Sequence, residues 1–143
     1  MKNILVAVDL EKGTLQLINT ATSLAEKNNS KVWVLHIAEP EPDFVGNEAG
    51  PRYIRVNRAK ELRSEHKLVH RYTERLKTKN IKAEGLLIAG ATVDMIMQEI
   101  NKLKIDFVII GHRKHSFLYK MFFPSTDTAV IKKSKVPVLV IPV

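Results

Sequence analysis

Apolar positions along the chain fall into two patterns that alternate with each other. Short, almost uninterrupted apolar runs rich in β-branched residues are typical of strands buried on both faces of a parallel sheet. The longer stretches between them place apolar residues three or four positions apart, which is the spacing of amphipathic helices. The runs predict strands at 4–8, 32–37, 85–89, 107–110 and 138–141, and the longer stretches predict helices at 14–28, 53–79, 92–104 and 126–133.

The order of these elements predicts the fold class. Strands that alternate with helices form right-handed βαβ crossovers, which give a parallel sheet covered by helices on both faces. We therefore expect a single α/β domain over residues 1–143. In the first helix, Leu15, Ile18 and Ala21 are expected to face the core. Ser125 is expected to cap the fourth helix at its N-terminus.

The composition excludes several classes of protein. Hydrophobic residues make up 45% and charged residues 27% of the 143 positions, and there is no cysteine. Disulfides, thiolate nucleophiles, zinc–cysteine sites and iron–sulfur clusters are therefore excluded. No apolar run approaches the ~18 residues that span a bilayer, and the chain opens on a strand-like run without the features of a signal peptide. We expect a cytoplasmic protein with no membrane partner.

Positive charge is concentrated in one segment. The net charge is +8, and the region Arg52–Lys79 contains ten basic and three acidic residues. Within it Lys67, Arg71, Arg75 and Lys79 recur every four residues, so they line one face of the predicted helix. Like charges at this spacing cost ~0.2–0.5 kcal/mol per pair. This basic helix is expected either to meet an anionic partner, such as the phosphates of a nucleic acid, or to be a solvated outer face.

Chemistry in a sheet of this type is expected just beyond the carboxyl ends of the strands. Asp9 follows the first strand, Ile37 ends the second, and Gly111 follows the fourth, immediately before a basic segment at 112–115. An acid, a peptide edge and a basic cluster would then meet at one edge of the sheet. The excess of basic residues there favours an anionic ligand.

Five segments of the chain, taken in order, resemble the universal stress protein family. They are Ile4–Asp9, Val34–Ile37, Gly90–Ile96, Asp106–His112 and Val136–Ile141. The resemblance covers the whole chain. It implies a Rossmann-like, five-stranded parallel sheet in the order 3-2-1-4-5, a homodimer, and a role in stress response or signalling.

ATP-binding members of this family have three glycines around the phosphates, the last of them followed by Ser or Thr. The matching positions here are Gly111, Lys114, Pro124 and Ser125, so only the first glycine is present. Proline has no N–H to donate, and lysine adopts a positive φ only at a cost. By resemblance, Ala7 and Ile37 would contact adenine, Asp9 the ribose or a metal ion, Ile110, Gly111 and Arg113 the ribose and phosphates, and Ser125 and Thr126 the terminal phosphates.

Two interpretations of this altered glycine pattern stay open. In the first, the crevice binds ATP or AMP, with Mg at Asp9, because Arg113, Lys114 and His112 supply side-chain charge in place of backbone donors. In the second, the chain no longer binds ATP and acts through protein partners or, through its basic helix, on nucleic acid.

Sequence signals for catalysis are weak. The chain has no G-x-S-x-G elbow, no P-loop lysine motif and no cysteine nucleophile. We therefore expect no enzyme activity beyond slow ATP hydrolysis. His66 and His70 have a metal-binding spacing but lack a third ligand. His36, in a buried strand, is expected to be a hydrogen-bonded core residue.

The last strand is expected at an edge of the sheet, because Pro137 removes one donor from the hydrogen-bond ladder. An apolar edge favours aggregation unless it is covered, and a two-fold partner would cover it. We therefore expect a homodimer through Val136–Ile141. The proline- and glycine-rich stretch at 38–51 predicts a long loop, and the sequence does not define its path.

Overall fold

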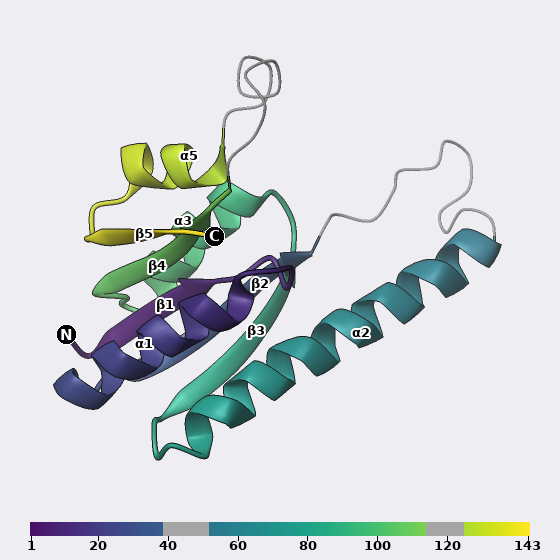
Figure 1. Cartoon of the computed structure of the whole chain (residues 1–143). Coiled ribbons are helices and arrows are strands. Elements are labelled where there is room, and N and C mark those ends of the chain that lie inside the picture. The colour runs from purple at the N-terminus through teal and green to yellow at the C-terminus, as the bar shows by residue number, and fades with distance from the viewer. Residues whose placement is uncertain (39–51, 114–124) are drawn as a thin grey trace.

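Five parallel strands form one sheet in the order β3-β2-β1-β4-β5 in the computed structural model, which describes residues 1–38, 52–113 and 125–143 (Figure 1). The predicted strand order is confirmed. The chain runs from β1 outward to β2 and β3 and then returns to β4 on the other side of β1, so the strand order switches between β1 and β4. The strands are β1 (Asn3–Ala7), β2 (Lys31–Ala38), β3 (Ala83–Ala89), β4 (Phe107–His112) and β5 (Val138–Pro142).

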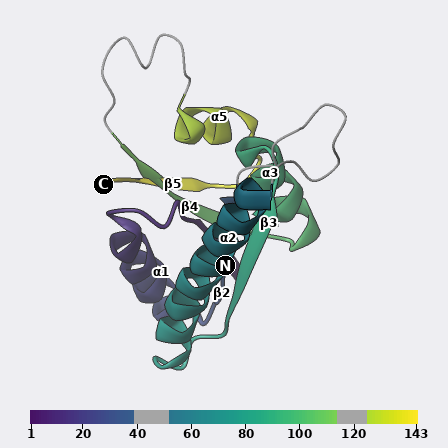
Figure 2. The ribbon, with the colours of Figure 1, turned by 90° about the vertical axis from the view of Figure 1, so that its right-hand side faces the viewer.

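Helices cover both faces of the sheet, as predicted. Helices α1 (Thr14–Asn28) and α2 (Arg52–Lys77) lie on one face, and α3 (Thr92–Lys102) and α5 (Thr126–Lys133) lie on the other (Figure 2). The predicted ends of α1 and α5 match the structure, whereas α2 and α3 each end two residues earlier than predicted. Asn80 and Lys104 have φ values of 60° and 53° shortly after these two ends, a left-handed conformation that does not continue a helix.

The pleat of the sheet divides the core into two layers. Successive side chains of a strand point to opposite faces. Ile4 and Val6 therefore join the layer under α1 and α2, and Leu5 joins the layer under α3 and α5. All three are 0% exposed. A central strand buried on both faces accounts for the continuous apolar run from which β1 was predicted.

The prediction for the inner face of α1 was wrong at Leu15. This residue is 44% exposed, whereas Leu17 is 4% exposed. A Cβ at Gly111 would lie 3.5 Å from a methyl carbon of Leu17, which is an ordinary contact distance, so Leu17 packs beside the end of β4. The periodicity placed Ile18 and Ala21 correctly, but it assigned the third inward position to Leu15 instead of Leu17.

Several predictions fall outside the described residues. They concern the loop that follows Ala38, up to residue 51, and the two residues at glycine positions of the family motif, Lys114 and Pro124. Among the residues that the structure describes, none of the helices combines the length and the apolarity that a bilayer crossing requires.

Candidate functional site

A cavity of about 290 Å³ opens at the carboxyl ends of β1, β2 and β4, beside the point where the strand order switches. All eight residues that sequence analysis assigned to a nucleotide site line this cavity. They are Ala7, Asp9, Ile37, Ile110, Gly111, Arg113, Ser125 and Thr126. The structure therefore brings together residues from four separate segments of the chain, and their contact with a nucleotide stays a prediction.

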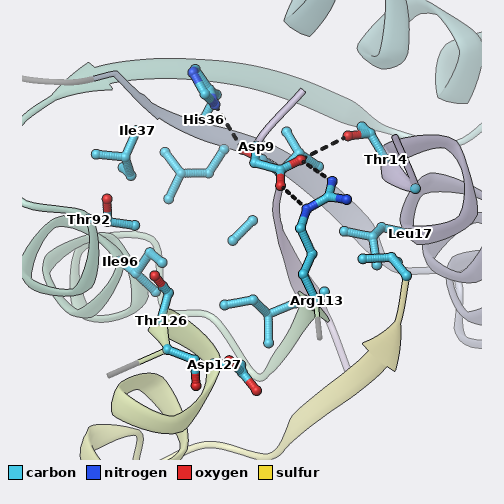
Figure 3. A pocket seen from close by; sticks show the side chains of 18 residues that line it. Asp9, Thr14, Leu17, His36, Ile37, Thr92, Ile96, Arg113, Thr126 and Asp127 are labelled. Atoms are coloured by element: carbon cyan, nitrogen blue, oxygen red, sulfur yellow. Dashed lines mark hydrogen bonds and ion pairs between the residues drawn. The ribbon is translucent and has the colours of Figure 1, made fainter. Parts of the chain in front are cut away.

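Arg113 reaches across the cavity mouth and holds Asp9 (Figure 3). Its Nε donates to Asp9 Oδ2 at 2.9 Å and its Nη2 donates to Asp9 Oδ1 at 3.2 Å, a two-pronged contact that matches the carboxylate geometry. Arg113 Nη2 also donates to the main-chain carbonyl of Lys12. The guanidinium thus joins the end of β4 to the loop between β1 and α1.

The loop after β1 adds further donors to the same carboxylate. The Glu11 N–H donates to Asp9 Oδ1 at 3.0 Å, and the Thr14 hydroxyl lies 3.5 Å from that oxygen. Burial of Asp9 tends to raise the pKa of its carboxyl, but the hydrogen bonds from Arg113 and Glu11 and the Arg113 charge outweigh it, so the pKa lies below its usual value. The same contact raises the pKa of Arg113. Both side chains stay charged at neutral pH.

A second contact between ionisable side chains, His112 and Asp127, lies at the start of α5. His112 Nδ1 is 2.7 Å from Asp127 Oδ2, and the Asp127 side chain is 10% exposed. Burial tends to raise the pKa of Asp127, but hydrogen bonds from Ser125 and His112 outweigh this effect and lower it. His112, predicted as a phosphate contact, is directed at Asp127 and is not among the residues that line the cavity.

Ser125 is the N-cap residue of α5, as predicted, but its side chain makes no capping hydrogen bond to the helix backbone. Its hydroxyl instead lies 2.7 Å from the Thr128 hydroxyl. The first backbone N–H groups of α5 are therefore not satisfied by this side chain. Such groups, at the positive end of a helix dipole, favour an anion.

The rest of the cavity wall consists mainly of apolar side chains and of His36, which is hydrogen-bonded to the main chain. Ile37, Ile96 and Ile110 come from β2, α3 and β4. His36 is 8% exposed, and its Nδ1 donates to the Val8 carbonyl at 2.8 Å, so it is the hydrogen-bonded core residue that was predicted. The cavity thus has an apolar side that fits a planar base and a polar side that fits charged groups.

Gly13 and Val143 form a wall that sequence analysis missed. Gly13 has φ 100°, and a Cβ there would lie 2.6 Å from Val143 Cβ, so both the conformation and the space require glycine. Thr14, Thr92 and Asp127 also line the cavity without having been predicted. The sequence could have indicated these three residues, because each lies in the first turn of a predicted helix whose N-terminus faces the carboxyl ends of the strands.

No group of three His, Asp or Glu side chains that could hold a metal ion occurs in the described parts of the chain. Asp9, predicted to hold Mg only as part of a Mg–nucleotide, has Arg113 on both of its oxygens. A cation at this carboxylate would first have to displace the guanidinium. His66 and His70 lie on exposed positions of α2 without a third ligand among the described residues.

Comparison with known proteins gives a consistent picture. The family model described as "Universal stress protein family" matches residues 1–142. "Universal stress protein A homolog 1" of Coxiella burnetii is 30% identical over 121 residues, which cover 84% of this chain and 82% of the relative. A universal stress protein in complex with cAMP has a TM-score of 0.75 at 18% identity, with 99% of this chain and 96% of that one covered. The universal stress protein from Archaeoglobus fulgidus in complex with dAMP has a TM-score of 0.67 at 19% identity, with 99% and 98% covered.

Proposed function

We propose that this chain, which belongs to the universal stress protein family, binds an adenine nucleotide in the cavity at the carboxyl ends of β1, β2 and β4. The observation that carries the proposal is the convergence of Asp9, Ile37, Arg113 and Ser125, from four segments, on one cavity. Structural relatives in complex with cAMP and dAMP support the choice of an adenine ligand. The ligand would make the protein a nucleotide-responsive module in stress response or signalling.

In this proposal, each side of the cavity binds a different part of the ligand. The apolar side, with Ala7, Ile37 and Ile110, fits the base. Asp9 fits the ribose hydroxyls, because a carboxylate accepts hydrogen bonds from both. The N-terminus of α5, at Ser125 and Thr126, fits the phosphates.

A second candidate function rests on the ion pair of Arg113 with Asp9. In this alternative the guanidinium occupies the ribose side permanently, and the protein acts through macromolecular partners without ATP. Arg113 then excludes the ligand, whereas in the first proposal it turns from Asp9 to the phosphates. The two functions predict opposite effects of removing the Arg113 charge.

Thermal unfolding with and without ATP, AMP and Mg tests the proposal. A ligand at 100 times its Kd stabilises the folded state by ~2.7 kcal/mol and raises Tm by several degrees. Asp9→Ala should abolish this rise. Glu11→Ala removes a carboxylate from the same loop, 3.9 Å from Arg113 Nε, and should leave the rise in place.

Arg113→Gln separates the two candidate functions. A smaller Tm rise than in the unmodified protein supports phosphate binding by Arg113, because the variant loses a charged donor. A larger rise, or one that appears only in the variant, shows that Arg113 blocks the crevice. No rise in either protein, and no nucleotide in the mass spectrum of the purified protein, rejects nucleotide binding.

The proposal assigns binding and no efficient turnover. We expect at most slow ATP hydrolysis, which release of inorganic phosphate measures. Mg would reach the site with the phosphates, and its effect on Tm in the presence and absence of ATP separates metal binding by the nucleotide from binding by Asp9. The cytoplasmic location stays a prediction.

A further inference from the structure

Helix α2 has a row of basic side chains on the side opposite the sheet. Val69 and Leu76 are buried against the core. Because a helix turns by about 100° per residue, Lys67 and Arg71 point in the opposite direction. Arg63 and Arg75 flank them, and all four are exposed. We call Arg63, Lys67, Arg71 and Arg75 the basic stripe.

The acidic residues of α2 are engaged elsewhere. Glu61 Oε2 lies 3.4 Å from Arg58, and Glu74 Oε1 lies 3.3 Å from Lys77. Glu65 faces the sheet, 3.7 Å from His36 Nε2. Among the described residues, no acidic side chain lies within ion-pair distance of the basic stripe. No ion pair within 4.0 Å therefore offsets the repulsion among these four charges in the described residues.

The basic stripe lies on the outside of the molecule. Figures 1 and 2 both show α2 on one flank of the sheet, and no other described helix covers its outward side. Lys79 and Lys82, two basic residues that follow the end of α2, are exposed as well. Within the described part of the chain, a large, charged partner therefore has access to the stripe.

The dimensions of the stripe fit a line of phosphates. Twelve residues separate Arg63 from Arg75, which is ~18 Å of helix axis. Duplex DNA has one negative charge per ~1.7 Å of axis, so a length of this size offers several phosphates to each cation. The stripe is a convex row of point charges, and phosphate contacts of this kind give affinity without reading the bases.

We propose that the basic stripe of α2 binds the phosphate backbone of duplex DNA, without base recognition and independently of the nucleotide cavity. An acidic protein would be expected to use apolar contacts as well. The nearest apolar surface is a groove between α2 and β3 that contains Leu62 and Leu87. Arg63 and Lys67 also line this groove, whereas Arg71 and Arg75 do not, so the C-terminal half of the stripe offers only charge.

Fluorescence anisotropy with a labelled 30-base-pair duplex of mixed sequence tests the proposal. Four phosphate contacts predict that log K falls with log salt at a slope of about −3.6, since each contact contributes about −0.9. Affinity should then fall on the order of 100-fold between 50 and 200 mM KCl. A second duplex of different sequence should bind within about threefold.

A matched pair of variants distinguishes the stripe from overall charge. Lys67→Gln/Arg71→Gln/Arg75→Gln should reduce the magnitude of the slope by about 2.7. Lys102→Gln/Lys132→Gln/Lys135→Gln removes the same charge from exposed positions on or next to α3 and α5, and should keep the full slope. Thermal unfolding of both variants checks that they fold, and both should respond to ATP like the unmodified protein if the cavity binds it.

Three results would overturn the proposal. Equal loss of affinity in both triple variants would mean that net charge alone attracts DNA. Polyglutamate or phosphatidylserine vesicles that bind more tightly than the duplex at equal charge concentration would assign the stripe to a protein or a lipid surface. The absence of measurable binding at 50 mM KCl would remove the stripe from consideration as a DNA site.

Discussion

At the scale of single residues, two basic side chains after one another in sequence contact two different acids near the cavity. Arg113 and Asp9 are separated by 104 positions in sequence, yet they form a two-pronged ion pair. His112 Nδ1 lies 2.7 Å from Asp127 Oδ2. The consecutive residues His112 and Arg113 point to opposite faces, as expected at the end of a strand. The two described residues of the predicted basic segment therefore contact two separate acids.

Asp127 makes folding dependent on pH. Its pKa is lowered in the folded state, so its contribution to stability is fully present above the unfolded value of about 3.9 and is lost as the pH falls through the folded value. Asp127→Asn should lower the free energy of unfolding by about 1–3 kcal/mol at pH 7, because a charged hydrogen-bond acceptor is removed from a buried position.

Urea unfolding of both proteins between pH 7 and pH 2.5 measures the difference. The difference in unfolding free energy between the unmodified protein and Asp127→Asn should become smaller below about pH 4. Asp94→Asn, at a carboxylate whose side chain is 68% exposed, serves as a control that should change stability by less than about 0.5 kcal/mol. If Asp127→Asn lowers the unfolding free energy by the same amount at every pH, the lowered pKa of Asp127 in the folded state is contradicted.

At the scale of the elements, each helix is fixed to the sheet by a narrow stripe of buried residues. Helix α2 buries Val69, Thr73 and Leu76, and α1 buries Leu17 and Ile18. Gly85 in β3 allows this close approach of α2, because a Cβ there would lie 2.6 Å from the Thr73 hydroxyl. The apolar spacing of a helix therefore gives its buried face only where the strand surface below it leaves space for the side chains.

Two leucine substitutions test which helix faces are buried. Leu76→Ala in the last turn of α2, at a residue that is 0% exposed, should cost about 2–5 kcal/mol of unfolding free energy. Leu15→Ala in α1, at a residue that is 44% exposed, should change it by no more than about 0.5 kcal/mol. Chemical denaturation measures both. Similar costs for the two variants would contradict the packing described above.

At the scale of the whole molecule, the sheet has two edges, β3 and β5. In β5 the residues Val138, Leu139 and Val140 are only half-buried in the single chain. Apolar residues along an open edge favour pairing with another strand. The homodimer through Val136–Ile141 therefore stays our prediction for the state in solution.

Light scattering coupled to size exclusion, at tens of micromolar protein, measures this state. We expect a particle with twice the mass of the chain. Val138→Lys should shift the particle to the mass of one chain, because a charge on an edge strand opposes pairing. Leu15→Lys, on the exposed side of α1, should leave the dimer intact. A monomer of the unmodified protein under these conditions would exclude the dimer.

The sequence by itself determined the strands, the helices, their order and the family. The elements and their order depend on local apolar periodicity and on the few ways in which alternating strands and helices can pack. The family depends on the resemblance that five segments of the chain carry. The strand-end rule located Asp9 and Gly111, and the resemblance to the family implied the other cavity residues, such as Ser125. Only the tertiary structure decided that Arg113 holds Asp9, that His112 holds Asp127, and that Leu17 and Val143 complete the wall. These contacts join residues far apart in the chain, and they depend on side-chain directions and on the space beside a glycine, which local patterns do not encode.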